Sequence, residues 1–568
     1  MSLKLQNPCT LVRYISPLQG RFFTTPFEQS LDLNNRWIKL ADQLDWDILA
    51  QEYHKCFNPD FGAPAVNARV VIGAVVIKHL LNLTDEDTIA TIQENLYMQY
   101  FLGLSSFQTE AVFAPSLFVL IRTRLTLSFW EKVTRDFVQK AQGVLSAEQS
   151  AQTNTEVKEI ENKENNSTEA VSPIATKEQP ILQEASADKT IKTNTDEDQG
   201  NEQQDTKQTD EASPQQEKTD NPNTGSLLID ATVAEQDIHY PTDLDLLNDG
   251  REKLEQIIDR LCENTNIAKP RTYPQNARKD FLNTARKKKR SAKEIRKAVG
   301  KQLNYIRRDL KHIDRLMPFS QSIQQTGICF KQLQYLLVIR TLYNQQKEMH
   351  NQGIHHCEDR IVSIHQPHVR PMVRGKAGSS VEFGAKIGLS LYNGYATIDT
   401  LCWDNYNETT DLSKAAQNYK QTYGHYPARI IADRKYCTKS NRNWCKENGI
   451  HLSGKPLGRP SAKTKQQQKD LKKDASERNA IEGKFGQGKR KYGLDYVFAK
   501  LKDTSQSWIG AIVFALNIVR WEHLFYLFFW WYPDLVRRIT GLNKGKYAGW
   551  QPVSTPLKGL LKLRLEII

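Results

Sequence analysis

The stretch at 474–493, DASERNAIEGKFGQGKRKYG, carries charged residues whose spacing could assemble a site. Arg478, Glu482 and Lys489 lie at positions i, i+4 and i+11, so an α-helix would present one carboxylate and two cations on a single face. That combination suits a site where a metal ion meets a phosphate, because the carboxylate binds the metal and the cations bind phosphate oxygens. A solvated basic helix explains the same pattern, and the glycines within the stretch weaken the helical prediction.

Two further acidic residues belong to predicted strands. Residues 227–233 (LLIDATV) form a short apolar run typical of a buried strand, and Asp230 lies inside it. A buried strand seldom contains a carboxylate without a functional reason, because an unpaired buried charge is costly. Residues 428–432 predict another strand, and Asp433 follows it, at the strand end where α/β folds bind ligands. The ordinary alternatives are a turn cap at Asp230 and a helix N-cap at Asp433.

The pattern Arg-x3-Glu-x6-Lys at 478, 482 and 489 resembles the signature of bacterial insertion-sequence transposases of the Asp-Asp-Glu class. The wider run RNAIEGKFGQGKRKYGL is similar to one subgroup of them, named for a Tyr-Arg-Glu-Lys motif, and so are the runs that follow Asp230 and surround Asp433. Ala475 departs from the motif, since these transposases often place a Tyr three residues before the Arg. Any DNA contact made by that Tyr would be missing here or supplied by another residue.

The resemblance implies both a fold and a chemistry. The fold is α/β, with a ribonuclease-H-like catalytic domain (a mixed sheet flanked by helices) in which Asp230, Asp433 and Glu482 converge as catalytic and metal-binding residues. Two Mg²⁺ ions, or Mn²⁺, held by these carboxylates would activate the attacking oxygen and stabilise the leaving oxygen of a phosphodiester. Arg478 and Lys489 would bind the DNA strand. The implied reaction is cleavage at the terminal repeats of an insertion sequence and joining of the 3′-OH ends to target DNA.

The composition agrees with a polyanionic partner. The 568-residue chain has a formal net charge of +13 and a pI near 9.1, although charge alone does not separate nucleic acid from an anionic membrane. Polar residues at Asn517, Arg520, Glu522 and His523 interrupt the apolar run 508–531, which predicts a buried core helix rather than a membrane span. The resemblance implies double-stranded DNA as the partner, both terminal inverted repeats and target, and a homodimer on the DNA.

Cysteine, histidine and the N-terminus give three further expectations. The eight cysteines form no CxxC pair, which favours reduced thiols over a disulfide framework or a zinc ribbon. The histidines between 355 and 368 match no common zinc spacing. The N-terminal stretch lacks a continuous apolar core, so no signal peptide is predicted. With the resemblance, these features lead us to expect a bacterial cytoplasmic protein associated with the nucleoid.

Composition divides the chain into four predicted parts. Residues 28–144 are expected to form an all-helical N-terminal domain, and 145–224, which are polar and lack aromatic residues, a disordered linker. Residues 225–540 would form the catalytic domain, with a basic helical insertion at about 244–352, and 541–568 a C-terminal tail. The helical domain resembles the one that precedes the catalytic domain in the same transposases. This domain has three alternative roles: recognition of the terminal repeats, dimerisation, or packing without base contacts.

Basic residues outside the motif are candidates for contacts to the DNA backbone. The densest cluster is ARKKKRSAKEIRK at 285–297, and a second is a basic, glycine-containing loop, RPMVRGKAGSS, predicted at 370–380. A solvated surface is the ordinary alternative for both. The candidate DNA-binding residues beyond the motif are Arg286, Lys288, Arg290, Arg370, Arg374, Lys376 and Arg434.

Several element boundaries follow from local patterns. The alternating runs 381–391 and 395–402, separated by an Asn-Gly pair, predict a β-hairpin, and the short alternating run 360–364 predicts a strand. Residues 85–102 predict one helix with acidic residues in its first turn. Residues 454–473 predict a polar, basic loop that leads to the helix carrying the motif.

Two other functions stand beside the transposase. A catalytically decayed or domesticated relative would bind DNA without cutting it, and Ala475 is the sequence feature in its favour. A nuclease of the same fold would cut DNA without joining strands and without preferring terminal repeats. A strand-transfer assay separates the nuclease from the transposase, and DNA binding without metal-dependent nicking by the wild-type protein would favour the decayed relative.

Overall fold

The computed structural model describes residues 30–57, 65–143, 223–265, 267–317, 327–373, 381–454 and 465–540, and for 265, 465–468 and 525–540 it describes the backbone alone. The linker predicted at 145–224 lies outside the described residues except for its last two positions, and the predicted C-terminal tail lies wholly outside them. The candidates Arg374 and Lys376 also lie outside the described residues.

Short helices make up the N-terminal region. They are α1 (Arg36–Gln43), α2 (Trp46–His54), α3 (Ala68–Leu81), α4 (Asp85–Glu94), α5 (Leu96–Phe101) and α6 (Leu117–Arg124), followed by a helix at 127–143. α3 is buried along nearly its whole length, because apolar residues surround its axis instead of forming one stripe. The prediction of one helix at 85–102 is wrong. The Asn95 side chain accepts hydrogen bonds from the backbone N–H groups of Tyr97 and Met98, so the chain starts a new helix there.

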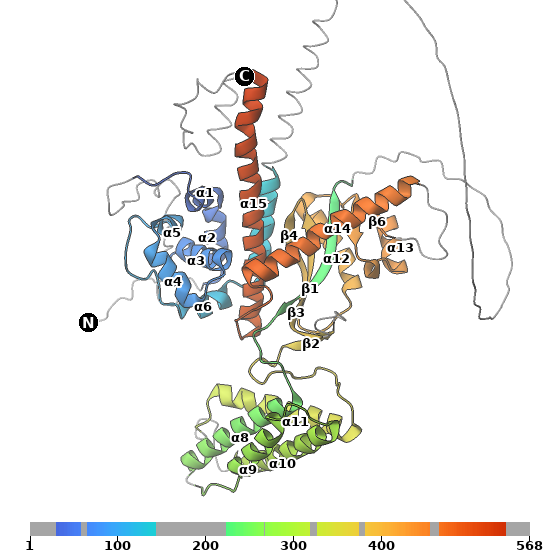
Figure 1. Cartoon of the computed structure of the whole chain (residues 1–568). Coiled ribbons are helices and arrows are strands. Elements are labelled where there is room, and N and C mark those ends of the chain that lie inside the picture. The colour runs from blue at the N-terminus through green and yellow to red at the C-terminus, as the bar shows by residue number, and fades with distance from the viewer. Residues whose placement is uncertain are drawn as a thin grey trace, which may run out of the picture. The chain divides into compact units, whose positions relative to one another are not determined.

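The described residues contain one mixed sheet of six strands (Figure 1). The strands are β1 (Ser226–Glu235), β2 (Arg370–Val373), β3 (Val381–Tyr392), β4 (Tyr395–Cys402), β5 (Arg429–Ala432) and β6 (His451–Ser453). Their order is β2-β3-β1-β5-β6, with β4 also paired to β3. β1 runs antiparallel to β3 and parallel to β5, and β5 runs parallel to β6. The predicted hairpin is confirmed, since Asn393 and Gly394 both adopt the positive φ that a tight turn requires.

Helices pack on both faces of this sheet (Figure 1). They are α12 (Asp411–Tyr423), α13 (Lys439–Glu447), α14 (Lys465–Tyr492) and α15 (Lys502–Thr540). α14 and α15 share a core with one face, and α12 and α13 with the other. Side chains of β1 alternate between the two cores, so Leu228 packs on the α14 side and Ile229 on the α12 side. The face that each strand residue points to therefore follows from its position along the strand.

α15 connects the sheet to the N-terminal helices. Ile512 and Leu516 belong to the core beneath the sheet, whereas Phe514 and Ile518 belong to the core of the N-terminal region. The buried core helix predicted at 508–531 is confirmed over the part whose side chains are described, which ends at residue 524. Within the described residues, no helix has both the length and the apolar composition needed to span a membrane.

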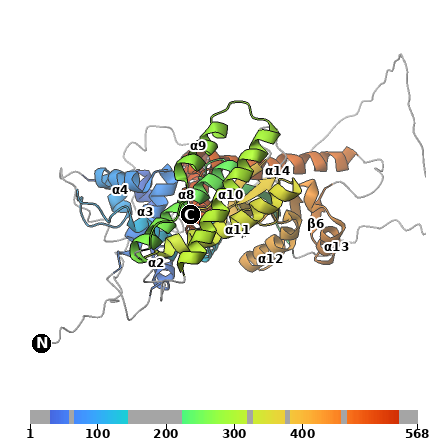
Figure 2. The same cartoon turned by 90° about the horizontal axis from the view of Figure 1, so that it is seen from below.

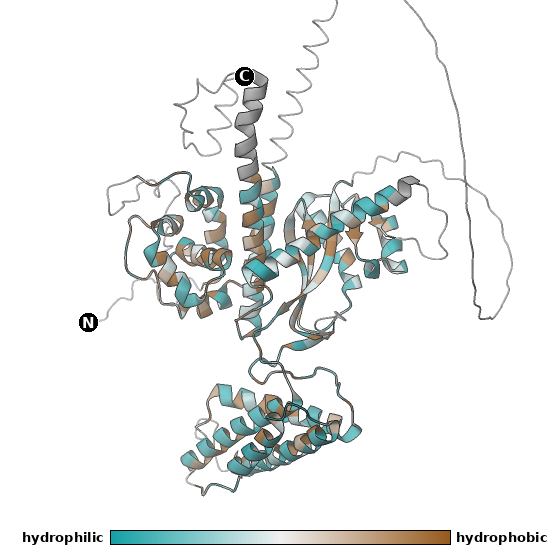
Figure 3. Ribbon diagram, viewed as in Figure 1, coloured by the Kyte–Doolittle hydropathy of each residue, from teal (hydrophilic) through white to brown (hydrophobic). Residues whose placement is uncertain are grey.

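The described residues between β1 and β2 form four α-helices, which make up the basic insertion (Figure 2). They are α8 (Asp243–Thr265), α9 (Pro274–Ala285), α10 (Ala292–Leu316) and α11 (Phe330–Gln352). Leucine and isoleucine side chains from α8, α10 and α11 form a core separate from that of the sheet. Figure 3 shows hydrophilic and hydrophobic residues interleaved along these helices, as expected where each helix buries one stripe.

The predicted strand at 360–364 is wrong, because its alternation has another cause. The segment is irregular, and Ile361 and Ile364 pack into the core of the insertion while Val362 packs into the core of the sheet. The backbone N–H of Ile361 donates to the side-chain oxygen of Gln345 instead of to a neighbouring strand. The alternating pattern of apolar residues arises here because the segment runs between two cores and contributes side chains to both.

Two predicted loops are partly regular structure. Residues 370–373 of the predicted basic loop form β2 along the edge of β3. The loop predicted at 454–473 gives way to α14 at Lys465, since the lysine, glutamine and leucine residues of 465–473 are good helix formers. The glycines of the motif do not interrupt α14. Gly488 is useful there, because a Cβ at this position would lie 3.2 Å from Leu494 and 3.5 Å from Leu516 of α15.

Candidate active site

Asp230 and Asp433 occupy adjacent positions on neighbouring strands. β1 and β5 pair in parallel with Ile229 opposite Ala432, so Asp230 is the next residue of β1 and Asp433 directly follows the end of β5. Both aspartates share the strand face of Leu228, which is the face that α14 covers. The sequence pattern placed each aspartate at its strand, and the parallel pairing of the strands brings them together.

Arg478 on α14 ties the helix to the strand acids. Its guanidinium donates to Oδ1 of Asp433 at 2.7 Å and lies 3.2 Å from Oε1 of Glu482, one helical turn along. α14 is anchored above the sheet by Ile481 and Phe485, which are buried in the core that the helix shares with it. The structure thus connects the arginine and the glutamate of the motif to the second strand acid.

The charges of these side chains act on one another. Burial raises the pKa of the Asp230 carboxyl above its ordinary value, and the nearby carboxylates of Asp433 and Glu482 raise it further, while Arg478 opposes that shift. All four groups are therefore within electrostatic reach. The region holds a surplus of negative charge that a single guanidinium balances only in part.

The carboxylates of Asp230, Asp433 and Glu482 are the groups here that could bind a metal ion. Among the described residues, no group of three or more His, Cys, Asp or Glu side chains lies close enough together to hold one ion. Asp433 and Glu482 are bridged by Arg478 instead. The donor chemistry nevertheless fits a hard divalent cation, since Asp230, Asp433 and Glu482 offer only carboxylate oxygens. Asp433 and Glu482 also lie close enough to Asp230 to raise the pKa of its carboxyl.

A second set of contacts, which the sequence did not reveal, fixes the start of the motif helix. The Arg429 guanidinium of β5 donates to Asp474 at 2.9 Å and to Glu477 at 2.5 Å, both on α14, and also to the Ser226 hydroxyl of β1. The Ser453 hydroxyl of β6 donates to the other oxygen of Asp474. Asp474 is only 7% exposed. No local pattern marks these residues, because their partners come from three strands and one helix.

The other predicted DNA-binding residues have varied surroundings. Lys489 lies 3.6 Å from Glu235 at the end of β1, away from the pair formed by Arg478 and Glu482. The Arg370 guanidinium donates to the backbone carbonyls of Pro367 and Val369, so it stabilises the entry to β2. In contrast, Arg434 is exposed in the short 3₁₀ helix that follows Asp433.

The candidates on the insertion lie at the turn between α9 and α10. Arg286 and Lys288 are exposed there. Arg290 is also exposed, but its guanidinium donates to the carbonyls of Ala285 and Lys287 and so closes the end of α9. None of these three residues lies in the cluster formed by Asp230, Asp433, Glu482 and Arg478.

Comparisons with known proteins bear on both halves of the chain. Residues 430–519 match the family model described as "Transposase DDE domain", and residues 25–124 match the one described as "Transposase domain (DUF772)". The first match contains Asp433, Arg478, Glu482 and Lys489 but not Asp230, whose assignment rests on its position beside Asp433.

A curated relative is the "Uncharacterized protein ORF8 in nfe locus" of Rhizobium meliloti, which is 29% identical over 104 residues, or 18% of this chain. The chain spans about half the length of that relative, 50%. No solved structure matches the chain. The two family matches, one to the N-terminal helices and one to the region of β5, α14 and α15, support an insertion-sequence transposase of the Asp-Asp-Glu class.

Proposed function

We propose that this chain is a metal-dependent DNA transposase of the Tyr-Arg-Glu-Lys subgroup, which cleaves at the terminal repeats of its insertion sequence and joins the 3′-OH ends to target DNA. The observation that carries the proposal is the adjacency of Asp230 and Asp433 at two parallel strands, with Glu482 linked to Asp433 through Arg478. The transposase family match over Asp433 and Glu482 supports it independently.

The proposed fold is ribonuclease-H-like. The support is the strand order, in which β4, β3 and β1 are antiparallel neighbours and β5 and β6 continue the sheet in parallel to β1. The catalytic domain would extend over 225–540 with the helical insertion at about 244–352, and the N-terminal helical domain over 28–144. Partners would be the double-stranded terminal repeats and target DNA, held by a homodimer because two ends must be cut together.

In the proposed mechanism, Asp230 and Asp433 would hold a divalent cation, Mg²⁺ or Mn²⁺, with Glu482 as the third carboxylate. Such ions, when bound, stabilise the attacking and leaving oxygens of an in-line displacement at phosphorus. Arg478 would have a second role, in binding the DNA. Its planar guanidinium can exchange the carboxylates for a phosphate of the scissile strand, which it would bind with two parallel hydrogen bonds. Arg434, which is exposed beside Asp433, would contact the same strand.

The proposal is tested with Asp230→Asn, Asp433→Asn and Glu482→Gln proteins on DNA that contains the element's ends. Each substitution keeps the side-chain volume and removes one charge. We expect wild-type protein to cut and join in the presence of Mg²⁺, and each variant to be slower by at least about 1000-fold, which corresponds to about 4 kcal/mol of transition-state stabilisation. Glu263→Gln, on the exposed end of α8, is the matched control and should retain full activity.

The other results of this experiment would each lead to a different conclusion. Full cleavage by one of the three variants would refute the role assigned to that residue. Wild-type binding to the ends without any metal-dependent nicking would favour the decayed relative, in line with Ala475. Cutting without joining, and without preference for the ends, would favour a nuclease of the same fold.

A further inference from the structure

The turn between α9 and α10 is a dense and fully exposed basic surface. Residues 286–297 are all exposed, and they contain eight lysine or arginine residues against one acid, Glu294. The turn is short and leads directly into α10 at Ala292. The surface is therefore built on the ends of two packed helices.

Three of the eight cations maintain the shape of this turn. Lys287 pairs with Glu294 at 2.7 Å, and Arg290 donates to the carbonyls of Ala285 and Lys287. Arg296 donates to the backbone carbonyl of His350 at 2.9 Å, which ties α10 to α11. These contacts, together with the capping box of Ser291 and Glu294, give the turn a defined structure.

The remaining five cations make no contact that shapes the turn. They are Arg286, Lys288, Lys289, Lys293 and Lys297, and within the part of the chain that the structure describes their side chains have no hydrogen-bond or ion-pair partner. Like charges gathered on one surface without counter-ions repel one another, so a polyanion that contacts several of them at once would gain from each contact.

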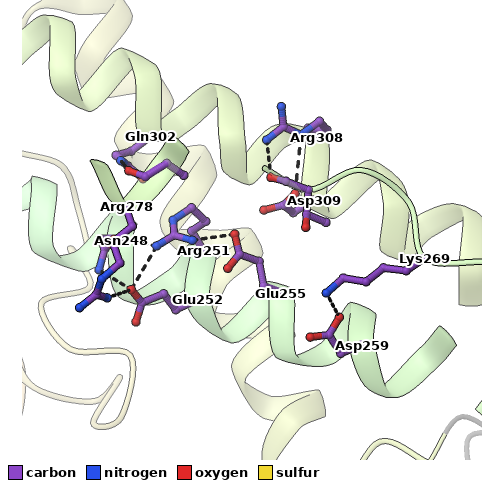
Figure 4. A network of polar contacts seen from close by, with 12 residues as sticks. Asn248, Arg251, Glu252, Glu255, Asp259, Lys269, Arg278, Gln302, Arg308 and Asp309 are labelled. Atoms are coloured by element: carbon purple, nitrogen blue, oxygen red, sulfur yellow. Dashed lines mark hydrogen bonds and ion pairs between the residues drawn. The ribbon is translucent and has the colours of Figure 1, made fainter. Parts of the chain in front are cut away.

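Two acids of α8 are paired away from the turn. On α8, Glu252 pairs with Arg251 and with Arg278 of α9, and Glu255 pairs with Arg251 (Figure 4). Arg251 is 1% exposed, whereas Arg278 lies at the surface, so this network runs from the interior of the insertion to its surface along α8 and α9. These carboxylates contact none of the five cations, which leaves the surface at the turn strongly positive.

A furrow along α9 continues the surface. It is lined by Gln275, Arg278, Lys279, Leu282, Asn283 and Arg286. Arg286 belongs both to this furrow and to the turn, and the amides of Gln275 and Asn283 add hydrogen-bond donors of the kind that contact phosphates. The stretch 286–297 has only one large apolar residue on its surface, Ile295, which is 38% exposed. A membrane-bound amphipathic helix would need a broad apolar face, and an intercalating wedge a protruding one.

We propose that Arg286, Lys288, Lys289, Lys293 and Lys297 form a phosphate clamp that holds the backbone of double-stranded DNA without reading its sequence. The inference rests on the proposed function, because it supplies the DNA that this surface would hold. Lysine side chains bind phosphates as flexible point charges, so binding depends on salt and hardly at all on base sequence. The insertion thereby contributes a DNA contact of its own, separate from the carboxylate cluster.

The test compares two double variants of the full-length protein that lose the same charge. Lys288→Gln/Lys289→Gln removes two clamp residues, and Lys331→Gln/Lys347→Gln removes two exposed lysines of α11. Binding to two fluorescent duplexes, one with a terminal repeat and one of unrelated sequence, is measured by anisotropy over a series of NaCl concentrations with EDTA present. Circular dichroism melting establishes that each variant is folded.

We expect the clamp variant to lower the slope of log affinity against log salt by about 2, at roughly 0.9 for each lost phosphate contact, and equally for both duplexes. The control should keep the wild-type slope. An unchanged slope in the clamp variant, or an equal loss in the control, would overturn the clamp. Because EDTA prevents cleavage, a protein that fails as a transposase can still show the slope change, and an active transposase can still fail to show it.

Discussion

The cluster at the strand ends and the helical insertion both contain many ion pairs, yet the two regions form them differently. Around the cluster, partners come from distant parts of the sequence, as when Arg478 meets Asp433 or Arg429 meets Asp474. In the insertion, many partners are close in sequence, as when Arg251 meets Glu255 one turn along α8 (Figure 4). Ion pairs between residues close in sequence form wherever the helix forms. Ion pairs between distant residues require the sheet and α14 to be in place, so disrupting one of them should weaken the others.

The largest effect should follow from breaking a distant pair. Asp474→Ala leaves the Ser453 hydroxyl without its carboxylate and the Arg429 guanidinium with Glu477 alone, and we expect a loss of about 3 kcal/mol in the free energy of unfolding. α14 also carries Arg478 and Glu482. A small displacement of the helix should therefore slow DNA cleavage by about 100-fold. Denaturant unfolding and single-turnover cleavage measure the two effects.

Asp495→Ala is the control for this comparison, since Asp495 is exposed just beyond α14 and should affect neither quantity. The two readouts distinguish positioning from stability alone. If Asp474→Ala unfolds more easily but cleaves at the wild-type rate while it is folded, then this contact does not position the motif helix.

An intermediate effect is expected from Asp309 inside α10. This residue is fully buried, and neither of its carboxylate oxygens has a hydrogen-bond partner in the described structure. Burial raises the pKa of Asp309 to about 7, and Glu255 adds to the shift while Arg308 and Arg251 oppose it. Because the folded pKa exceeds the unfolded value of 3.8, the folded state binds the proton more tightly. The insertion should therefore lose stability as pH rises from about 4 to about 7.

Asp309→Asn removes the titrating group and should flatten that dependence. Between pH 5 and pH 8 the wild-type insertion should lose roughly 2–3 kcal/mol more than the variant does. Hydrogen exchange of α10 peptides, corrected for the intrinsic pH dependence of exchange, measures the local free energy of opening. Asp314→Asn, at a half-exposed position on the same helix, is the control. Parallel pH profiles for wild type and Asp309→Asn would contradict the assignment.

The same contrast explains what the sequence could predict. Asn393-Gly394, the insertion helices and the run before Asp433 are local signals, so their elements were predicted correctly. The link between Arg429 and Asp474 could not be predicted, because it depends on which strands lie together. Local alternation at 360–364 was misleading for the same reason, since two separate cores bury its residues. The motif predicted that Arg478, Glu482 and Lys489 share one helix face, but only the parallel register of β1 and β5 places Asp230 beside Asp433.

The smallest effect should come from Ser291→Ala, which removes the helix cap that Ser291 and Glu294 form at the start of α10. The Ser291 side chain accepts from the N–H of Glu294, whose carboxylate accepts from the N–H of Ser291, so the substitution exposes the first turn of α10. We expect a loss of about 1 kcal/mol in local stability, seen as faster hydrogen exchange at the start of α10, with Ser291→Thr close to wild type because threonine also caps. Cleavage should be unchanged. If Ser291→Ala slowed cleavage as much as Asp474→Ala does, local and distant contacts would act as one unit and the contrast between the two regions would fail.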